Sequence, residues 1–287
     1  MTSHSPDLNV ARRAAELRRT GDETVDVLVI GGGITGVGVA LDAAARGLSV
    51  TLLEAEDLAF GTSRFSSKLV HGGLRYLATG DVATAKESAV ERHLLMTRIA
   101  PHLIRPLGQL LPFTTGVTAR QRAAGTVGMA MGDLLRIRAR TPSRFLPPPR
   151  LVPSLSRAGL RGGMLSYDGQ LVDDARLVVT VARTAASHGA RILSRVRALE
   201  LRRDGAIAQD VLTDERLDIR ARAVVNATGV WAGSLDESIT VRPSRGTHIV
   251  LDAADLGDPS AALTIPHEGS ILSLIHISEP TRRRGIS

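Results

Sequence analysis

The spacing of apolar residues near the start of the chain changes twice, and these changes predict a strand, a helix and a second strand. Val27 to Ile30 is an apolar run of the length of a buried strand. From Ile34 to Arg46 the apolar residues follow helical spacing, and Gly47 marks the end of that helix. Ser49 to Leu53 is another apolar run, and Glu54 follows it. The pattern therefore predicts a βαβ unit that closes on an acid.

The turn between the first predicted strand and the helix has the spacing Gly31-x-Gly33-x-x-Gly36. In a dinucleotide-binding turn the first glycine permits the tight bend, the second lets a pyrophosphate approach the backbone, and the third lets helix and strand pack closely. The helix N-terminus offers free N–H groups and a partial positive charge to a diphosphate. Glu54 lies about twenty residues on, where an acid meets the adenosine ribose. We therefore predict a dinucleotide site, because a purely structural βαβ unit leaves three adjacent glycines unexplained.

The segment before this unit, residues 1–24, is polar. Asn9 is placed to cap a short basic helix that runs to Arg19. We expect an N-terminal extension packed on the protein surface, with docking on a membrane as the alternative.

The middle of the chain contains one long helical pattern and one irregular region. Asp81 to Ala100 reads as a helix that Asp81 caps and Pro101 stops. Residues 102–165 are predicted to form loops and short helices. Prolines punctuate this region at Pro142, Pro147, Pro148, Pro149 and Pro153.

A second helix-and-strand pattern follows. Asp173 is expected to cap a helix that runs to His188 and ends at Gly189. Strands are predicted at 190–193, 197–201 and 222–225, with a hairpin turn at 204–205 and a further strand from about residue 245. The backbone around Ala198 is expected to lie against the adenine. Thr228 and Gly229, in a turn of small residues, offer the dinucleotide a second stretch of backbone.

Composition narrows the classes of protein. The chain has 287 residues, of which 43% are hydrophobic and 2% aromatic, and it has no cysteine, which excludes disulfides, thiolate metal sites and a cysteine-linked flavin. The net charge is +7, but the basic residues are scattered and lack interleaved aromatics, so we do not expect a nucleic-acid partner. The first twenty residues lack the apolar core of a signal peptide, and the apolar stretch 25–41 carries Asp26 and five glycines. We expect a soluble protein, or one bound to a membrane surface.

A segment rich in hydroxyl groups follows Glu54. It contains Thr62, Ser63, Ser66 and Ser67, then Lys68, and then the run His71-Gly72-Gly73-Leu74-Arg75-Tyr76. Only Lys68 and Lys86 are lysines among 36 basic residues, which hints at a need for a compact ammonium group at Lys68. Arg75 offers a planar fork suited to phosphate or carboxylate.

The strings along the chain resemble the FAD-dependent, quinone-linked glycerol-3-phosphate dehydrogenase family over residues 25–270. They are GGGITGVG, TSRFSSKLVHGGLRYL, KESAVERHLLMTRIAPHL, SYDGQLVDDARLV, VVNATGVWA and RGTHIVL, in the family's order. The resemblance implies an α/β fold, with a Rossmann-type FAD-binding domain like those of glutathione reductase and D-amino-acid oxidase. It implies an FAD-binding domain at 25–100 and 170–235, and an incomplete α+β substrate domain at 101–169 and 236–270.

The resemblance also implies the chemistry. FAD would accept a hydride at N5 from glycerol 3-phosphate, giving dihydroxyacetone phosphate, and electrons would pass on to quinone. By matched position, the ADP portion would be held by Gly31, Gly33, Gly36 and Glu54. The flavin end would be lined by Thr62, Ser66, Ser67 and Lys68. The substrate would be faced by Arg75 and Tyr76. His71 would act either as the base or as a hydrogen-bond partner of the flavin ring. The resemblance further implies a cytoplasmic location with peripheral contact at the inner membrane, and it allows a homodimer.

The end of the chain departs from the family pattern near residue 271. The last stretch, ILSLIHISEPTRRRGIS, looks like a peptide translated from adapter sequence, so we expect residues 271–287 to be a disordered, non-native tail. Since the family's further phosphate-binding residues have no counterpart here, we expect the 287-residue chain to bind FAD weakly and turn over little. Two alternatives remain: a related amino-acid or amine oxidase, and an inactive FAD-binding fragment.

Overall fold

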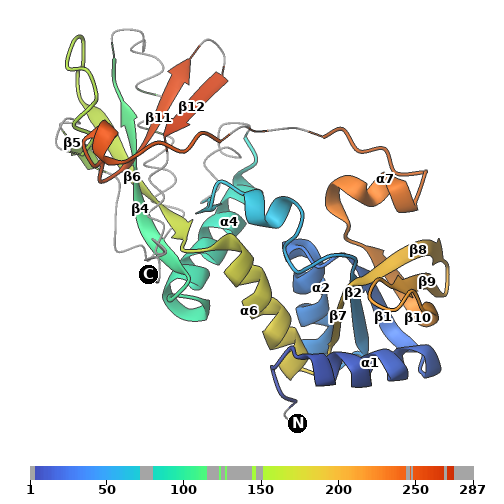
Figure 1. Ribbon diagram of the computed structural model, residues 1–287. Helices are drawn as coiled ribbons and strands as arrows, with labels where there is room; N and C mark the ends of the chain where they lie inside the picture. Colours follow the sequence, from blue (N-terminus) through green and yellow to red (C-terminus); the bar gives the residue numbers. More distant parts are fainter. Residues whose placement is uncertain are drawn as a thin grey trace, which may run out of the picture. The chain divides into compact units, whose positions relative to one another are not determined.

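The computed structural model describes residues 4–71, 80–114, 123, 127, 144–146, 151–243, 246, 248–267 and 270–274. The chain divides into two units (Figure 1), of which unit 1 comprises Met1–Ser66 and Asp173–Gly246, and unit 2 comprises Ser67–Val172 and Thr247–Ser287. Residues 67–100, predicted as part of the FAD-binding domain, therefore lie in unit 2. The reason is tertiary: within this segment Arg92 forms a buried ion pair with Asp168, which also belongs to unit 2.

Unit 1 is built on a sheet with the strand order β7-β2-β1-β10-β9-β8. The first four strands are parallel and the last three antiparallel, so β10 belongs to both parts. The elements of unit 1 are α1 Val10–Asp22, β1 Val25–Ile30, α2 Ile34–Ala45, β2 Val50–Glu54, the 3₁₀ turn η1 Thr62–Phe65, α6 Asp174–Ser187, β7 Arg191–Ser194, β8 Val196–Arg202, β9 Gly205–Asp210, β10 Arg216–Asn226, η4 Gly229–Trp231 and α7 Ala232–Leu235.

The predicted βαβ unit is confirmed as β1, α2 and β2. Ile30 lies opposite Leu53 of β2 on one side and Asn226 of β10 on the other. Because parallel strands end at the same edge of a sheet, the loops after these three strands come together at one edge. This register brings the glycine turn, Glu54 and the turn after β10 to the same place.

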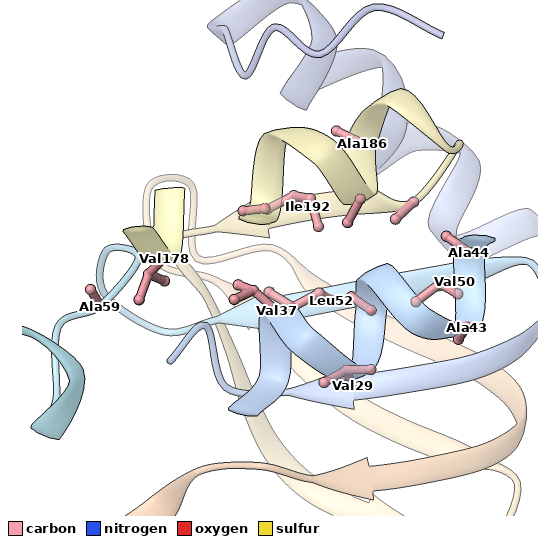
Figure 2. Close-up of a cluster of buried hydrophobic side chains, with 14 residues drawn as sticks. Val29, Val37, Ala43, Ala44, Val50, Leu52, Ala59, Val178, Ala186 and Ile192 are labelled. Carbon is pink, nitrogen blue, oxygen red and sulfur yellow. The ribbon is translucent and has the colours of Figure 1, made fainter. Parts of the chain in front are cut away.

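Helices α2 and α6 cover one face of the parallel strands (Figure 2). Val37 of α2, Leu52 of β2 and Val178 of α6 are all buried in this cluster. Alanines dominate the helix surfaces that meet here, and small side chains let helices and sheet approach closely. The packing fixes α2, and with it the end of the helix that faces the glycine turn.

The opposite face of the parallel strands is covered by the β8–β9 hairpin, which continues the sheet beyond β10. Leu28 and Leu53 pack there with Ala206 and Ala208 of β9. Strand β10 begins at Arg216, six residues before the predicted start. In this additional part, buried Leu217, Ile219 and Ala221 alternate with exposed polar residues. Such alternation is typical of a strand with one solvent-facing side.

The N-terminal segment forms helix α1, which Asn9 begins as predicted by accepting a hydrogen bond from the Arg12 N–H. The Arg12 side chain donates to the carbonyls of Ala186 and Ala190 at 3.2 Å each. Arg13 donates to both carboxylate oxygens of Asp210. These contacts tie α1 to the C-terminal end of α6, to the loop after it and to β9, so the segment is an integral part of unit 1.

Glu16 of α1 makes the stability of unit 1 dependent on pH. Its Oε1 accepts a hydrogen bond from Arg12 at 2.6 Å, whereas its buried Oε2 has no partner among the described residues. Burial raises the pKa of Glu16 by more than the hydrogen bond and charge of Arg12 lower it. The folded state thus holds this proton more tightly than the unfolded state, so the ionised carboxylate costs stability as pH rises above the unfolded pKa. We expect Glu16→Gln to raise Tm at about pH 8, with the gain shrinking near about pH 4.

Asp210 supplies the control with the opposite sign. Burial acts to raise the pKa of Asp210, but hydrogen bonds from Arg13 and from the Leu212 N–H, with the charge of Arg13, outweigh it and leave the pKa lowered. Its contribution is present above the unfolded pKa and is lost as pH falls, so Asp210→Asn should lower Tm at about pH 8. Thermal unfolding at the two pH values separates the variants. A Glu16→Gln protein that is less stable than the parent at both would contradict the prediction.

Unit 2 contains a second sheet, with the strand order β12-β11-β4-β6-β3, and β5 pairs with β6. Its described elements are β3 Leu69–Val70, α4 Val82–Leu94, the π-helical turn η2 Leu95–Ile99, β4 Ile104–Pro112, β5 Arg144–Leu146, β6 Gly163–Leu171, η5 Ala254–Leu256, β11 Ala262–His267 and β12 Ser270–Leu274. Helix α4 begins at the predicted cap, Asp81, whose side chain accepts from the Thr84 N–H at 3.0 Å. The predicted helix to Ala100 ends instead at Leu94 and continues as η2.

The prediction of loops and short helices over 102–165 is wrong for β4, for β5 and for the start of β6. Strand β4 buries Ile104, Leu107 and Leu110, so its apolar spacing is three rather than two and does not resemble a strand. Pro106 pairs only with β6 among the described strands, because β11 meets β4 further along, at Gln109 and Leu110. A proline is tolerated in a strand where one side lacks a neighbour.

Two predictions about the end of the chain also need correction. The strand expected from residue 245 is not found among the described residues 246 and 248–252, where Ile249 and Val250 are 79% and 93% exposed. Conversely, residues 271–274, expected to be disordered, form β12 and pair with β11. Arg245 and residues 275–287 lie outside the described residues. None of the helices in the described part of the chain has the length and hydropathy of a membrane span.

Candidate functional site

The glycine turn of unit 1 holds backbone so close to backbone that side chains are excluded. Gly31 has φ +111°, and a Cβ there would lie 2.6 Å from the carbonyl oxygen of Ala227. A Cβ on Gly36 would lie 1.8 Å from the carbonyl oxygen of Gly31, so the first turn of α2 rests directly on the end of β1. The turn is therefore a bare backbone surface at the edge of the sheet.

The N-terminus of α2 presents hydrogen-bond donors at this surface. The first intrahelical bond runs from the Val37 N–H to the Gly33 carbonyl, and the Ile34 N–H donates to Ser63 Oγ at 2.9 Å. In the described part of the chain, no protein acceptor meets the N–H groups of Gly33, Thr35 and Gly36. The first turn of α2 also contains no acidic residue. Free N–H groups at a helix N-terminus attract an anion such as phosphate.

Glu54 is fixed beside the glycine turn by two backbone donors. Its Oε2 accepts from the Gly32 N–H at 2.7 Å, and its Oε1 accepts from the Glu56 N–H at 2.8 Å. Each carboxylate oxygen has a second lone pair, so Glu54 can still accept hydrogen bonds from ligand hydroxyl groups.

The turn after β10 reaches the same edge. The Ala227 N–H donates to the Ile30 carbonyl at 2.8 Å, and the Thr228 hydroxyl donates to Asn226 Oδ1 at 2.6 Å. The structure thus brings the backbone of Ala227 and Thr228 next to Gly31, and Gly229 follows them in the chain.

The structure buries the Ala198 side chain in the core cluster under the β8–β9 hairpin. Its neighbour Arg197 donates to Glu56 at 2.7 Å, and Arg195 donates to the other carboxylate oxygen at 3.1 Å. Strand β8 therefore lies beside the segment that follows Glu54, and only the backbone of Ala198 is left to approach a ligand there.

The hydroxyl-rich segment lies across the N-terminus of α2. Thr62 begins η1, and Ser63 is the residue whose hydroxyl accepts from the Ile34 N–H. Ser66 donates through its N–H and its hydroxyl to Asp174 of α6. The site residues predicted from the sequence did not include Ser63 or Asp174. Ser63 lies in the string TSRFSSK and Asp174 in the string VDDARL, and both strings carry the family resemblance.

Aromatic side chains surround this segment. Gly61 lies against Trp231, because a Cβ there would be 2.8 Å from the indole ring. The Arg64 guanidinium lies over both Phe60 and Phe65, 4.6 Å from each ring centre. Phe65 and Trp231 are exposed. In a chain with so few aromatics, this gathering singles out one edge of unit 1.

The remaining predicted site residues belong to unit 2. Lys68 adopts a left-handed backbone conformation with φ +55°, and its carbonyl accepts from the Leu171 N–H. His71 is exposed, and its Nδ1 lies 3.5 Å from Oδ2 of the buried Asp168. Asp168 also forms an ion pair with buried Arg92, which donates in addition to the Tyr167 carbonyl. Ser67 precedes these residues in the chain, and Arg75 and Tyr76 lie outside the described residues.

Asp168 was not predicted as a site residue. Its string SYDGQLVDDARLV was recognised in the sequence, but no local pattern relates Asp168 to His71, nearly a hundred residues earlier. The antiparallel pairing of β3 with β6 brings the two segments together, because Val70 lies opposite Gly169.

Comparisons with known proteins agree with this geometry. Residues 26–280 match the DAO family, described as FAD dependent oxidoreductase. Glycerol-3-phosphate dehydrogenase 1 of Mycobacterium tuberculosis H37Rv is 54% identical over 278 residues, which make up 93% of this chain and 54% of that protein. The α-glycerophosphate oxidase of Streptococcus pneumoniae is 36% identical over 288 residues, covering 89% of this chain and 47% of the relative. The chain spans about half the length of the curated relatives it matches.

Solved structures share the fold. The glycerol-3-phosphate dehydrogenase from Bacillus halodurans, solved with FAD, matches with a TM-score of 0.68 and 26% identity, covering 95% of this chain and 48% of that one. Glycine oxidase from Geobacillus kaustophilus matches with a TM-score of 0.55 and 18% identity, over 87% of this chain and 70% of that one, which shows a shared fold alone.

The family match extends to residue 280, past the break expected near residue 271. It spans both units, and the parallel strands with their glycine turn form the predicted Rossmann-type α/β fold. The resemblance to glycerol-3-phosphate dehydrogenases holds over nearly the whole chain. The chain therefore belongs to the family of FAD dependent oxidoreductases.

Proposed function

We propose that the protein oxidises glycerol 3-phosphate to dihydroxyacetone phosphate with FAD as the hydride acceptor. The observation that carries this proposal is the convergence of three elements at one edge of unit 1: the bare glycine turn, Glu54 and the Thr228 turn. The relatives named above add the substrate, because they are glycerol-3-phosphate dehydrogenases and an α-glycerophosphate oxidase.

The residues at this edge fit an adenine dinucleotide. Gly31 and Gly36 have no room for a side chain, and the free N–H groups at the α2 N-terminus suit a diphosphate. Glu54 would bind the ribose hydroxyls, and the backbone at Ala198 would meet the adenine. Thr228 and Gly229 would add backbone contacts from the second turn.

FAD, when bound, supplies the site that accepts the hydride from C2 of the substrate. The flavin end is assigned to Thr62, Ser66, Ser67 and Lys68, as the family resemblance implies. The alcohol must also lose its hydroxyl proton, and a neutral imidazole is suited to take it. His71 is therefore proposed as the base, with a hydrogen bond to the flavin ring as its alternative role.

Asp168 supports the first role of His71. An Nδ1–H group facing the Asp168 carboxylate leaves Nε2 as the nitrogen with a free lone pair, which a base requires. Arg75 and Tyr76 are proposed to bind the substrate, with the Arg75 fork on its phosphate. Unit 1 is accordingly proposed as the FAD-binding domain and unit 2 as part of the substrate domain.

The second electron acceptor is proposed to be a quinone, reached by peripheral contact of a cytoplasmic protein with the inner membrane. Molecular oxygen is the second candidate, because one relative is named an oxidase. Peroxide release during turnover would identify oxygen, and reduction of a quinone analogue without peroxide would identify the quinone.

Anaerobic flavin bleaching tests the proposal directly. The 287-residue chain is mixed with enough FAD to saturate its site, and then with glycerol 3-phosphate, glycerol or an amino acid. We expect glycerol 3-phosphate to bleach the flavin absorbance, and glycerol, which lacks the phosphate, not to do so. Bleaching by the amino acid alone would identify an amino-acid oxidase. Bound flavin that no substrate bleaches would leave this chain an FAD-binding fragment.

A further inference from the structure

Asp174 is a buried carboxylate with one partner in its own helix and another in a distant segment of the chain. It lies in the first turn of α6 and is 4% exposed. Its Oδ2 accepts from the Ser66 hydroxyl at 3.0 Å and from the Ser66 N–H at 3.3 Å. Its Oδ1 accepts from the Ala175 N–H at 3.0 Å. A buried carboxylate is stable only when hydrogen bonds compensate its charge, so the bonds from Ser66 stabilise Asp174 inside unit 1.

The adjacent aspartate already performs the capping of α6. Asp173 is the N-cap residue, and its Oδ1 accepts from the Arg176 N–H at 3.0 Å. The two neighbouring carboxylates thus face different partners. Asp173 serves its own helix, whereas Asp174 binds a residue that lies 108 positions earlier in the chain.

Ser66 is one end of a short bridge to the glycine turn. It directly follows η1, and Ser63 near the other end of η1 accepts from the Ile34 N–H in the first turn of α2. A Cβ on Gly33 would lie 3.1 Å from Ser63 Oγ, so this hydroxyl rests against the turn itself. The contacts therefore run without a break from Asp174 through Ser66 and η1 to the α2 N-terminus.

We infer that Asp174 is a positioning residue for the cofactor: it anchors η1 so that Ser63 stays over the N-terminus of α2, where the diphosphate binds. The inference rests on the proposed function, which places an FAD diphosphate at this helix end. Asp174 itself makes no contact with the cofactor. It acts through Ser66, by removing the freedom of the η1 segment before the ligand arrives, and preorganisation of this kind increases affinity.

The test compares binding of FAD, by quenching of flavin fluorescence, and of ADP, by calorimetry, in variants of the whole chain. Asp174→Ala should weaken both ligands about tenfold or more, as expected for losing a hydrogen bond to a charged group. ADP is included because it carries the diphosphate without the flavin ring. Asp174→Asn keeps an acceptor oxygen in place and should recover most of the affinity, which a loss of charge alone would not allow.

Asp173→Ala is the matched control at the same helix end. It removes the N-cap and should lower Tm, but both dissociation constants should stay within about twofold of the parent. Ser66→Ala removes only the hydroxyl bond and keeps the N–H bond, so it should weaken ADP binding in the same direction as Asp174→Ala but by less. The double variant should be no weaker than Asp174→Ala, because that substitution already removes both bonds to Ser66. Ser66→Ala still tests the inference if Asp174→Ala fails to fold.

Unchanged affinity in Asp174→Ala or in Ser66→Ala, with FAD bound normally by the parent, would overturn the inference and leave the proposed function intact. Equal weakening by Asp173→Ala would reduce Asp174 to a structural residue of α6 and would also overturn it. A parent chain that binds neither FAD nor ADP would overturn the proposed function, and the inference with it.

Discussion

Replacing Gly36 with alanine is expected to abolish FAD binding and to lower the free energy of unfolding by about 3 kcal/mol or more. The added Cβ would lie 1.8 Å from the carbonyl oxygen of Gly31, and that atom is backbone at the end of β1, which cannot rotate away. Helix α2 would have to move off the sheet. The N–H groups proposed to bind the diphosphate would then leave their positions beside Glu54.

Gly38 provides the control within the same helix. A Cβ on Gly38 would meet no other atom within 4 Å. Gly38→Ala should therefore raise the free energy of unfolding by about 0.5–1 kcal/mol, since alanine favours the helix more than glycine does. Urea unfolding and a flavin fluorescence titration measure both effects. A Gly36→Ala protein that keeps the parent's FAD affinity would show that the close approach of α2 to β1 is not needed for the site.

Removing Arg92 should be the second largest effect, because this arginine forms the buried ion pair of unit 2 with Asp168. Both side chains are almost fully inaccessible to solvent, and Arg92 also donates to the Tyr167 carbonyl at 3.1 Å. Breaking a buried pair by removing one partner costs about 3–5 kcal/mol, since the remaining charge loses the opposite charge beside it. We expect Arg92→Leu to lower the urea midpoint of the chain accordingly.

Two further variants serve as controls for Arg92→Leu. Arg46→Ala breaks the exposed pair of Arg46 with Asp42 and should change the urea midpoint little, because water screens the attraction between these two charges. The double variant Arg92→Leu with Asp168→Asn removes both charges of the pair, and it should be more stable than Arg92→Leu alone because the buried carboxylate is removed together with Arg92. If Arg92→Leu cost no more than Arg46→Ala, the pair would have no role in holding α4 on β6.

Much of unit 1 could be predicted because its signals are local. The apolar run before Gly31, the helical spacing after it and the acid at Glu54 are all contained in thirty residues, and the structure shows the strand, helix and strand in that order. Caps are equally local, and Asn9, Asp81 and Asp173 each begin the helix that was expected of them.

Strand β4 shows where local patterns fail. Its apolar residues do not alternate, and Pro106 stands inside it, so nothing within the segment indicates a strand. It becomes one because β6 supplies a full antiparallel partner from more than fifty residues away. The same holds for β12, whose order comes from its pairing with β11.

The sequence by itself determined the βαβ unit, the glycine turn, the acid that faces it and the family to which these strings point, because each depends on neighbours along the chain. Only the tertiary structure decided that Ser63 covers the start of α2, that Asp174 holds Ser66, and that Asp168 lies beside His71 while pairing with Arg92. These contacts join residues far apart in the sequence. The pairing of strands and the packing of helices create them, and no spacing along a single segment can encode them.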